Sequence, residues 1–402
     1  MPHFKSFALD DFVLEWGPLV EVGLWDSCIE PLTLAELQAF SPAKRILAEQ
    51  TQLRYGPRWG YPELREIVRR LYSAPELTAE DVIIASGCIS ANYLVLDTIV
   101  KAGDHVIVQH PTYNQLIELP RRAGAEVSLW KWRWKQESES ISWSMDFAEL
   151  EKLLQTNTKL IVLSNPTNPT GSELSREDLH RIIGIARSRD IVVMCDEVFR
   201  FMHHAKQTLP PPSLMELGYE KTIVTGSVSK GFALPGVRVG WLAVHPALRD
   251  SVLSPIKHSR DYTTITVSQV DQQIALFALS PGIRDQVLAR TREICQKNIA
   301  TLDAWVTKNK DWVSWQPSAG GGTGVIRITG NDGQPVDDVA FAIALAKEGK
   351  VCAPPAGHCF GHEADGTGST DLSGFLRIGI VMAGDTLERG LAAVERLRSR
   401  WH

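Results

Sequence analysis

The chain has 402 residues, 44% of them hydrophobic, which is enough to bury a large core and to form more than one domain. Its 42 basic and 47 acidic residues are interspersed and give a formal net charge of −5, a balance that does not favour nucleic acid or an anionic membrane as partner. No apolar stretch reaches the roughly 18 residues of a membrane span, and the N-terminus lacks the pattern of a signal peptide. Six cysteines without CxxC or zinc-site spacing are typical of reduced thiols, so we expect a cytoplasmic protein.

Short apolar runs alternate with helical patterns through the middle of the chain. The predicted strands cover Asp81–Ala85, His105–Gln109, Lys159–Ser164, Ile191–Cys195, Thr222–Thr225 and Gly240–Val244. Predicted helices cover Ser90–Val100 and Ser175–Arg189, and the second opens on a candidate capping box of Ser175 and Asp178. Apolar strands separated by helices predict an α/β fold with a mainly parallel sheet covered on both faces. Functional side chains should then lie in the loops that follow the strands.

The C-terminal third has a different pattern. A long helix is predicted over Ile283–Thr307, strands around Gly324–Ile328 and Phe375–Ile380, and an amphipathic helix over Thr386–Arg400. We therefore expect a large domain over residues 41–282 and a smaller α+β domain formed by residues 1–40 and 283–402.

The strongest chemical signal is the segment from Thr225 to Lys230, which runs past the end of a predicted strand. A lysine amine in this position can form an imine with an aldehyde cofactor. The hydroxyls of Ser227 and Ser229, together with Arg238, can bind a phosphate from the same loop. A lysine in a serine-rich loop is more often a solvated surface residue, so the companion motifs decide the interpretation.

Three companion motifs follow other strands. Asn168 lies in a Pro/Asn-rich turn and offers an amide donor to a ligand, although the turn itself is a sufficient reason for an asparagine. Asp196 follows the strand Ile191–Cys195, and a carboxylate facing a pyridine nitrogen would keep that nitrogen protonated and make the ring an electron sink. Gly87 and Cys88 stand at the start of a predicted helix, where backbone N–H groups bind phosphate. A glycine turn alone is common in α/β folds.

In this order the segments resemble the fold-type I pyridoxal 5′-phosphate (PLP) enzymes, the aspartate aminotransferase superfamily with aminotransferase classes I and II. The resemblance runs from about Leu53 to the C-terminus and implies a mainly parallel sheet of seven-stranded type between helices. It implies PLP as cofactor and Lys230 as the Schiff-base lysine, which also moves a proton between the substrate α-carbon and the C4′ atom of the cofactor.

The resemblance also implies roles for the matching residues. Asp196 would pair with the pyridine nitrogen, and Asn168 would donate to the phenolic oxygen beside the substrate. Tyr113 and Val198 would cover the two faces of the ring. The phosphate would bind to Gly87, Cys88, Ser227 and Arg238, with Ser229 as a further candidate.

Two matches concern the substrate and the partner subunit. Arg377 would hold the substrate α-carboxylate through two hydrogen bonds. Tyr55 would reach the phosphate of a neighbouring subunit, which implies a homodimer with shared active sites. Ordinary packing remains an alternative for Tyr113, and a structural ion pair remains one for Arg377.

The sequence departs from the family pattern at three places. Phe199 stands where most relatives have a tyrosine that donates to the phenolic oxygen, and a phenylalanine has no donor. We therefore expect the Schiff base to stay protonated to higher pH than in a typical relative. Cys88 replaces a residue that often carries a hydroxyl, and we expect a small effect because its backbone N–H can still serve. Leu24–Pro31 lacks the glycine-rich substrate loop of the family.

The preferred function is transamination of an α-amino acid, with Schiff-base exchange at Lys230 and ping-pong kinetics. The same residues also suit elimination or replacement, cyclisation, or oxygen-dependent oxidation of an amino acid in specialised metabolism. A regulatory protein on this scaffold is disfavoured, because few residues precede the first matched motif and no basic patch appears. The substrate side chain is not readable from these motifs.

Overall fold

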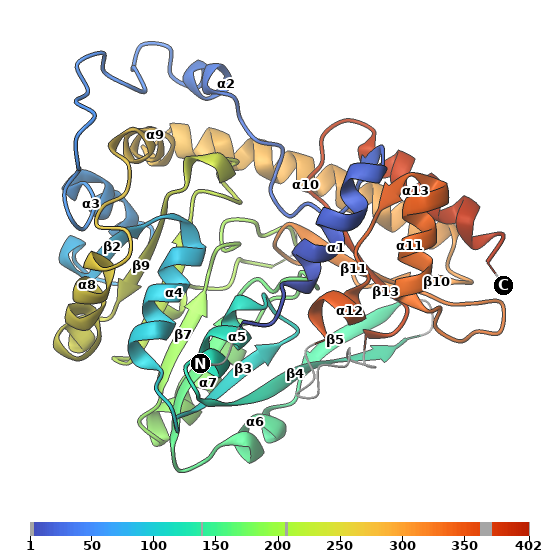
Figure 1. Cartoon of the computed structure of the whole chain (residues 1–402), viewed down its shortest axis with the longest axis horizontal. Coiled ribbons are helices and arrows are strands. Elements are labelled where there is room, and N and C mark those ends of the chain that lie inside the picture. Colours follow the sequence, from blue (N-terminus) through green and yellow to red (C-terminus); the bar gives the residue numbers. More distant parts are fainter. Residues whose placement is uncertain (1–3, 138–139, 206–207, 362–371, 402) are drawn as a thin grey trace.

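The computed structural model describes residues 4–137, 140–205, 208–361 and 372–401. Its largest feature is an eight-stranded sheet flanked by helices (Figure 1). The strands, in spatial order, are β2 (Val82–Ala85), β9 (Gly240–Val244), β8 (Thr222–Ser227), β7 (Val192–Asp196), β6 (Thr158–Ser164), β3 (His105–His110), β4 (Glu126–Gln136) and β5 (Ile141–Met145). The predicted α/β fold with a mainly parallel sheet is thereby confirmed.

Strands β3, β4, β6, β7 and β8 are parallel, whereas β9 is antiparallel to both of its neighbours. Neither β4 nor β5 was among the predicted strands. β5 folds back antiparallel on the far end of β4 and adds an eighth strand to the seven that the resemblance implied. There Trp134 and Trp143 pack against Phe375 of the C-terminal part of the chain. The extra strand therefore extends the sheet towards the C-terminal region rather than widening the central layer.

Both faces of the central strands are buried, as unbroken apolar strands require. Along β6, Val162 packs with one cluster of side chains while Ile161 and Leu163 pack with the other. One face is covered by α4 (Gly87–Ile99), α5 (Gln115–Arg122) and α8 (Ser254–Asp261), and the other packs against α3 (Pro62–Arg69), α6 (Phe147–Leu153) and α7 (Arg176–Ser188). The expected capping box opens α7, where the side chain of Ser175 accepts the backbone N–H of Asp178 and the side chain of Asp178 accepts the backbone N–H of Ser175.

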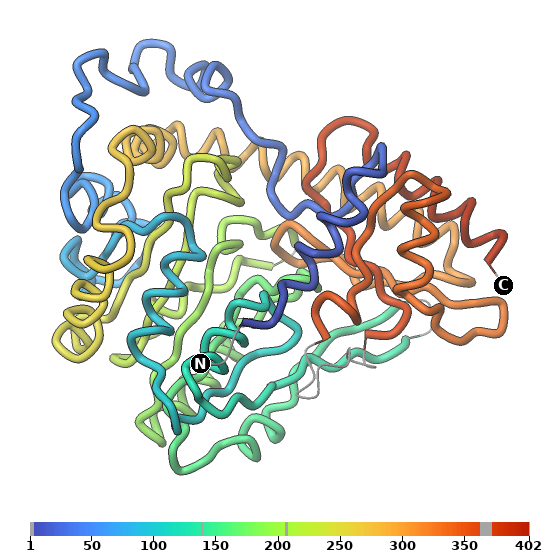
Figure 2. The backbone as a smooth tube through the Cα atoms, viewed as in Figure 1, coloured from blue at the N-terminus to red at the C-terminus, as the bar shows by residue number. Residues whose placement is uncertain are grey.

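The C-terminal region has a three-stranded antiparallel sheet of β10 (Val313–Trp315), β11 (Thr323–Ile328) and β13 (Phe375–Gly379). Its helices are α11 (Asp338–Gly349), α12 (Ala356–Phe360) and α13 (Thr386–Arg398), and the long α10 (Ile283–Lys308) joins it to α9 (Gln269–Leu279) (Figure 2).

The N-terminal segment belongs with this region. Helix α1 (Ala8–Trp16) packs on α12, and β1 (Val22–Gly23) pairs in parallel with β12 (Val351–Cys352). These contacts support the division that we propose, with residues 1–40 and 283–402 forming the small domain and residues 41–282 the large one. Beyond α2 (Leu34–Ala39) the chain passes outside α9, where Thr51 hydrogen-bonds to Gln273, before it enters α3 (Figure 2).

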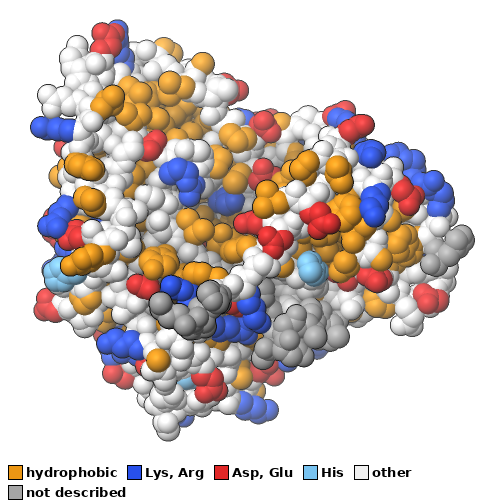
Figure 3. Space-filling model, viewed as in Figure 1, with side chains coloured by type: hydrophobic (Ala, Val, Ile, Leu, Met, Phe, Trp, Pro, Cys, Tyr) orange, Lys and Arg blue, Asp and Glu red, His pale blue; other side chains and the backbone are white. Residues whose placement is uncertain are grey.

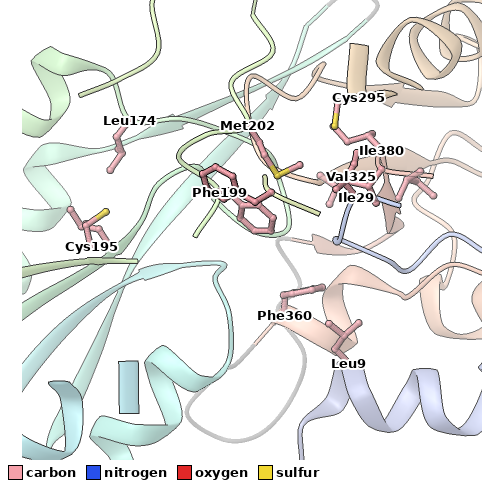
Figure 4. Packing of buried hydrophobic residues seen from close by; sticks show 14 of the residues in the cluster. Leu9, Ile29, Leu174, Cys195, Phe199, Met202, Cys295, Val325, Phe360 and Ile380 are labelled. Atoms are coloured by element: carbon pink, nitrogen blue, oxygen red, sulfur yellow. The ribbon is translucent and has the colours of Figure 1, made fainter. Parts of the chain in front are cut away.

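The register of the parallel strands brings the predicted motifs together. Asp196 at the end of β7 lies opposite Ser164 of β6 on one side and opposite Thr225 of β8 on the other. The loops with Asn168, Asp196 and Lys230 therefore leave the sheet at the same edge. Figure 4 shows the junction behind this edge, where Phe199 and Met202 lie between Cys195 of β7 and side chains of the small domain such as Val325 and Ile380.

Candidate active site

A cavity of about 550 Å³ opens at this edge, between the sheet, α1 and the loop after β1. Most residues that the sequence singled out line it: Cys88, Tyr113, Asn168, Asp196, Val198, Ser227, Ser229, Lys230, Arg238 and Arg377. Gly87 lies directly beneath Arg238. Tyr55 does not reach the cavity of its own chain, and 79% of its surface is exposed.

Lys230 extends into the cavity from the loop that follows β8. Its Nζ donates to Ser27 Oγ at 2.8 Å and to Cys28 Sγ at 3.0 Å, and it lies 5.7 Å from the centre of the Phe199 ring. Ser27 and Cys28 belong to the loop after β1, so the N-terminal segment supplies the polar neighbours of this amine. In the sequence that loop is only unusual for the family, because nothing in its composition points to a lysine 202 and 203 positions away.

Asp196 is buried and held by three donors. Asn92 Nδ2 donates to Oδ2 at 2.7 Å, and the Val198 N–H donates to Oδ1 at 2.9 Å. The Cys88 thiol lies 3.4 Å from Oδ1. Burial raises the pKa of Asp196, while the donors, chiefly Asn92, act in the opposite direction. A carboxylate kept from water in this way gains most from a cationic partner, as a protonated pyridine nitrogen would be.

Asn92 is a site residue that sequence analysis missed. Its amide also accepts from Thr225 Oγ1 at 2.7 Å, so it connects α4, β7 and β8 and fixes the orientation of the Asp196 carboxylate. Cys88 and Asn92 are four residues apart and therefore share one face of α4. That spacing was visible in the sequence, but it identifies a contact with Asp196 only once α4 is known to cross the end of β7.

The phosphate end of the cavity is built from backbone and Arg238. Gly87 has a φ of +79°, and a Cβ added there would come within 2.4 Å of Arg238 Nη2. The position therefore requires glycine both for its backbone conformation and for space. The first turn of α4 lines this cavity, as do Ser227 at the end of β8 and Ser229 in the loop after it. The Cys88 side chain faces Asp196, which leaves its backbone N–H as the group available to a phosphate.

Arg377 of β13 is buried at the other end of the cavity. One Nη donates to Asn168 Oδ1 at 3.3 Å and the other to the Trp25 carbonyl, while the buried Nε has no hydrogen-bond partner among the described residues. Burial lowers its pKa to about 10, so the group remains cationic at neutral pH. A buried cation without a carboxylate partner suits a substrate carboxylate.

Tyr113 lies between these two ends. Its ring packs against Phe7 with centroids 5.1 Å apart, and burial raises the pKa of its hydroxyl, so it stays neutral. With Val198 also lining the cavity, an aromatic and an aliphatic side chain are available to enclose a flat ring. Amine, carboxylate, phosphate cradle and ring-facing side chains are the groups that PLP needs, so the residues present fit this cofactor.

The Phe199 side chain gives a testable consequence in this cavity. Phe199→Tyr should lower, by about one to two units, the pH midpoint of the change in visible absorption of the holoenzyme, because a charge-assisted hydrogen bond to the phenolic oxygen is worth about 1.5–3 kcal/mol. A spectrophotometric pH titration measures it. Phe201→Tyr is the control, because Phe201 packs on Phe232 and does not line the cavity. Equal midpoints in Phe199→Tyr and the parent enzyme would mean that Ser27 or another donor already serves that oxygen.

Comparisons with known proteins agree with this geometry. A family model described as aminotransferase class I and II matches residues 30–394. Capreomycidine synthase of Streptomyces vinaceus is 28% identical over 389 residues, which cover 96% of this chain and 92% of that protein. Mouse tyrosine aminotransferase is 30% identical over 193 residues, so the chain aligns with only 41% of that protein's length.

Among solved structures, a PLP-dependent aminotransferase from Streptococcus suis superposes with a TM-score of 0.86 at 29% identity, covering 100% of this chain and 99% of that one. The PLP-dependent cyclase OrfR has the same fold, with a TM-score of 0.82 at 22% identity over 100% of this chain and 99% of its own. With the family match over most of its length, the chain belongs to the class I and II aminotransferases, which use PLP.

Proposed function

We propose that this protein is a PLP-dependent aminotransferase that acts on an α-amino acid. One observation carries the proposal: Lys230, Asp196 and Arg377 line a single cavity that also has a phosphate cradle. Each of the three groups has a separate task, and all three tasks are needed for proton movement at the α-carbon of an amino acid.

When bound, PLP supplies an electron-withdrawing ring that stabilises negative charge at the substrate α-carbon. Asp196, oriented by Asn92, holds the proton on the pyridine nitrogen, and Arg377 orients the substrate through its carboxylate. Lys230 would move the proton between the substrate α-carbon and the C4′ atom of the cofactor. Ser27 and Cys28 lie within hydrogen-bond distance of the Lys230 amine and would position it between these two atoms.

Cyclisation or another replacement reaction is the second candidate. The relative named capreomycidine synthase matches over nearly the whole chain, and Phe199 removes a donor from the cavity. Both reactions need the same Lys230, Asp196 and Arg377, so these residues do not separate them.

The two candidates differ in the form of the cofactor that remains. Incubating the holoenzyme with single amino acids, without a keto acid, should convert the cofactor to pyridoxamine phosphate, detected by absorption and by mass spectrometry of the released cofactor. One equivalent of keto acid should appear per active site. Repeated turnover without pyridoxamine, with ammonia, hydrogen peroxide or a cyclic product, would instead favour the second candidate.

We also propose a homodimer in the cytoplasm with shared active sites and a role in amino acid biosynthesis. Large side chains on the surface support the dimer: Leu53, Tyr55 and Tyr262 are 86%, 79% and 92% exposed. Hydrophobic side chains also gather at the upper left of the face in Figure 3, near α2 and α9. A partner covering Tyr55 would bring this tyrosine to the phosphate of the other subunit.

Within the described residues, no helix is long and apolar enough to cross a membrane. We propose no nucleic acid partner.

A further inference from the structure

The charges of the cavity point to the side chain of the substrate, given the proposed function. Three cations line the cavity, and that function assigns all of them: Lys230 to proton transfer, Arg238 to phosphate and Arg377 to the α-carboxylate. The side-chain end of an amino acid therefore meets the remaining charged groups. Among the described lining residues, Asp196 is assigned to the pyridine nitrogen, and the two charged groups that remain are both acidic, Asp10 and Asp26.

The two aspartates come from separate elements of the small domain. Asp10 lies in the first turn of α1, and Asp26 lies in the loop after β1, where its Oδ1 accepts the Cys28 N–H at 2.7 Å. Neither forms an ion pair within the described part of the chain. Loss of water raises the pKa of Asp10, and a cation placed beside it would reverse that effect.

Arg377 connects these aspartates to a bound substrate. Its buried guanidinium has an unpartnered Nε, and it interacts electrostatically with both Asp10 and Asp26. A ligand anchored by a carboxylate on Arg377 thus lies in the field of two carboxylates. The lining beside them is apolar, with Leu9 and Val13 of α1 and the ring of Trp25. An aliphatic stem would pack on these groups, whereas a second carboxylate on the substrate would find two like charges.

We propose that the substrate is an amino acid with an aliphatic side chain that ends in a cation, an amine or a guanidinium. Its α-carboxylate binds Arg377, its stem lies along α1 and Trp25, and its terminal cation lies between Asp10 and Asp26. Asp10 and Asp26 are exposed to water, and an uncharged side chain of equal length gains no attraction from either carboxylate, so it binds more weakly.

The test uses ligands that cannot react at an α-amine. The binding of δ-guanidinovalerate, which has a carboxylate and a guanidinium, is compared by calorimetry with that of heptanoate on the holoenzyme. Asp10 and Asp26 are exposed to water, so the guanidinium should tighten binding by about threefold to tenfold, as expected for two solvent-screened charge pairs acting together. This advantage should disappear in the double variant Asp10→Asn, Asp26→Asn. It should persist in Asp11→Asn, which removes a neighbouring charge of α1 that does not line the cavity.

Turnover provides a second measurement. kcat/KM for lysine or arginine should exceed that for norleucine, and the double variant should reduce this preference by about threefold to tenfold. The inference would be wrong if the parent enzyme bound δ-guanidinovalerate and heptanoate equally well. It would also be wrong if Asp11→Asn lost the preference for the cationic ligand to the same extent as the double variant. Conversion of norleucine as efficiently as lysine would overturn the substrate class and leave the aminotransferase intact. Failure of every amino acid tested to form pyridoxamine phosphate would overturn the proposed function itself.

Discussion

Lys230→Ala should lower turnover about 10⁴-fold, because it removes both the amine that holds the cofactor and the base that moves the proton. Borohydride should fix PLP to residue 230 of the parent enzyme, as read by peptide mass mapping, and should fix none to the variant. A small primary amine added to the buffer should restore part of the turnover, since the truncated side chain leaves its volume vacant.

The matched control is Lys221→Ala, one residue before the other end of β8, where the amine pairs with Asp190 on the surface. It should keep both turnover and borohydride fixation. If Lys230→Ala retained turnover, or if PLP were fixed to a different lysine of the parent enzyme, the assignment of Lys230 would be wrong. Rescue by amines separates a chemical role from a folding defect, because a misfolded protein would not respond to them.

Asp196→Asn should lower kcat/KM about 10³-fold, since an amide cannot hold a proton on the pyridine nitrogen and the loss of one preorganised charge typically costs 10²–10³ in rate. The isosteric change keeps the volume of the side chain next to Asn92. Steady-state kinetics with saturating PLP measures the loss, and a nearly unchanged KM would locate it in the chemical step.

The stability of the apoprotein should not fall with the activity when Asp196 is replaced by asparagine. Burial raises the pKa of Asp196 above 3.8, so the folded apoprotein holds the proton more tightly than the unfolded chain. Its contribution to stability is present below pH 3.8 and is lost as pH rises through the raised pKa. The Tm of apo Asp196→Asn should therefore not fall below that of the parent at neutral pH. A lower Tm together with lower activity would indicate a structural role for Asp196.

Six strands of the central sheet were predictable because each is a short apolar run that carries its own signal. The chemistry was predictable where a residue lies at or shortly after the end of such a strand, as Asp196 and Lys230 do, because the ends of parallel strands meet at one edge. Cys88 was placed in the phosphate cradle by position alone. The structure adds that its thiol faces Asp196, a direction set by how α4 crosses β7.

Other parts of the site depend on contacts between distant segments. Ser27 and Cys28 meet Lys230 only because β1 pairs with β12, and a two-residue strand has no periodicity to detect. The β4–β5 hairpin was missed because its tryptophans pack on a residue of the C-terminal sheet. The role that we propose for Tyr55 depends on contact with a second subunit, which a single chain does not include.

The pairing of β1 with β12 also constrains the order in which the protein can be assembled during synthesis. Val22 leaves the ribosome early, but its partner, Val351, is made only near the end of translation. Until then the first thirty residues have no strand to join, whereas β2 to β9 can already form their sheet. The wall of the cavity that carries Asp10, Ser27 and Cys28 is therefore among the last parts to form, and a nascent or truncated chain would have a folded sheet without a competent site.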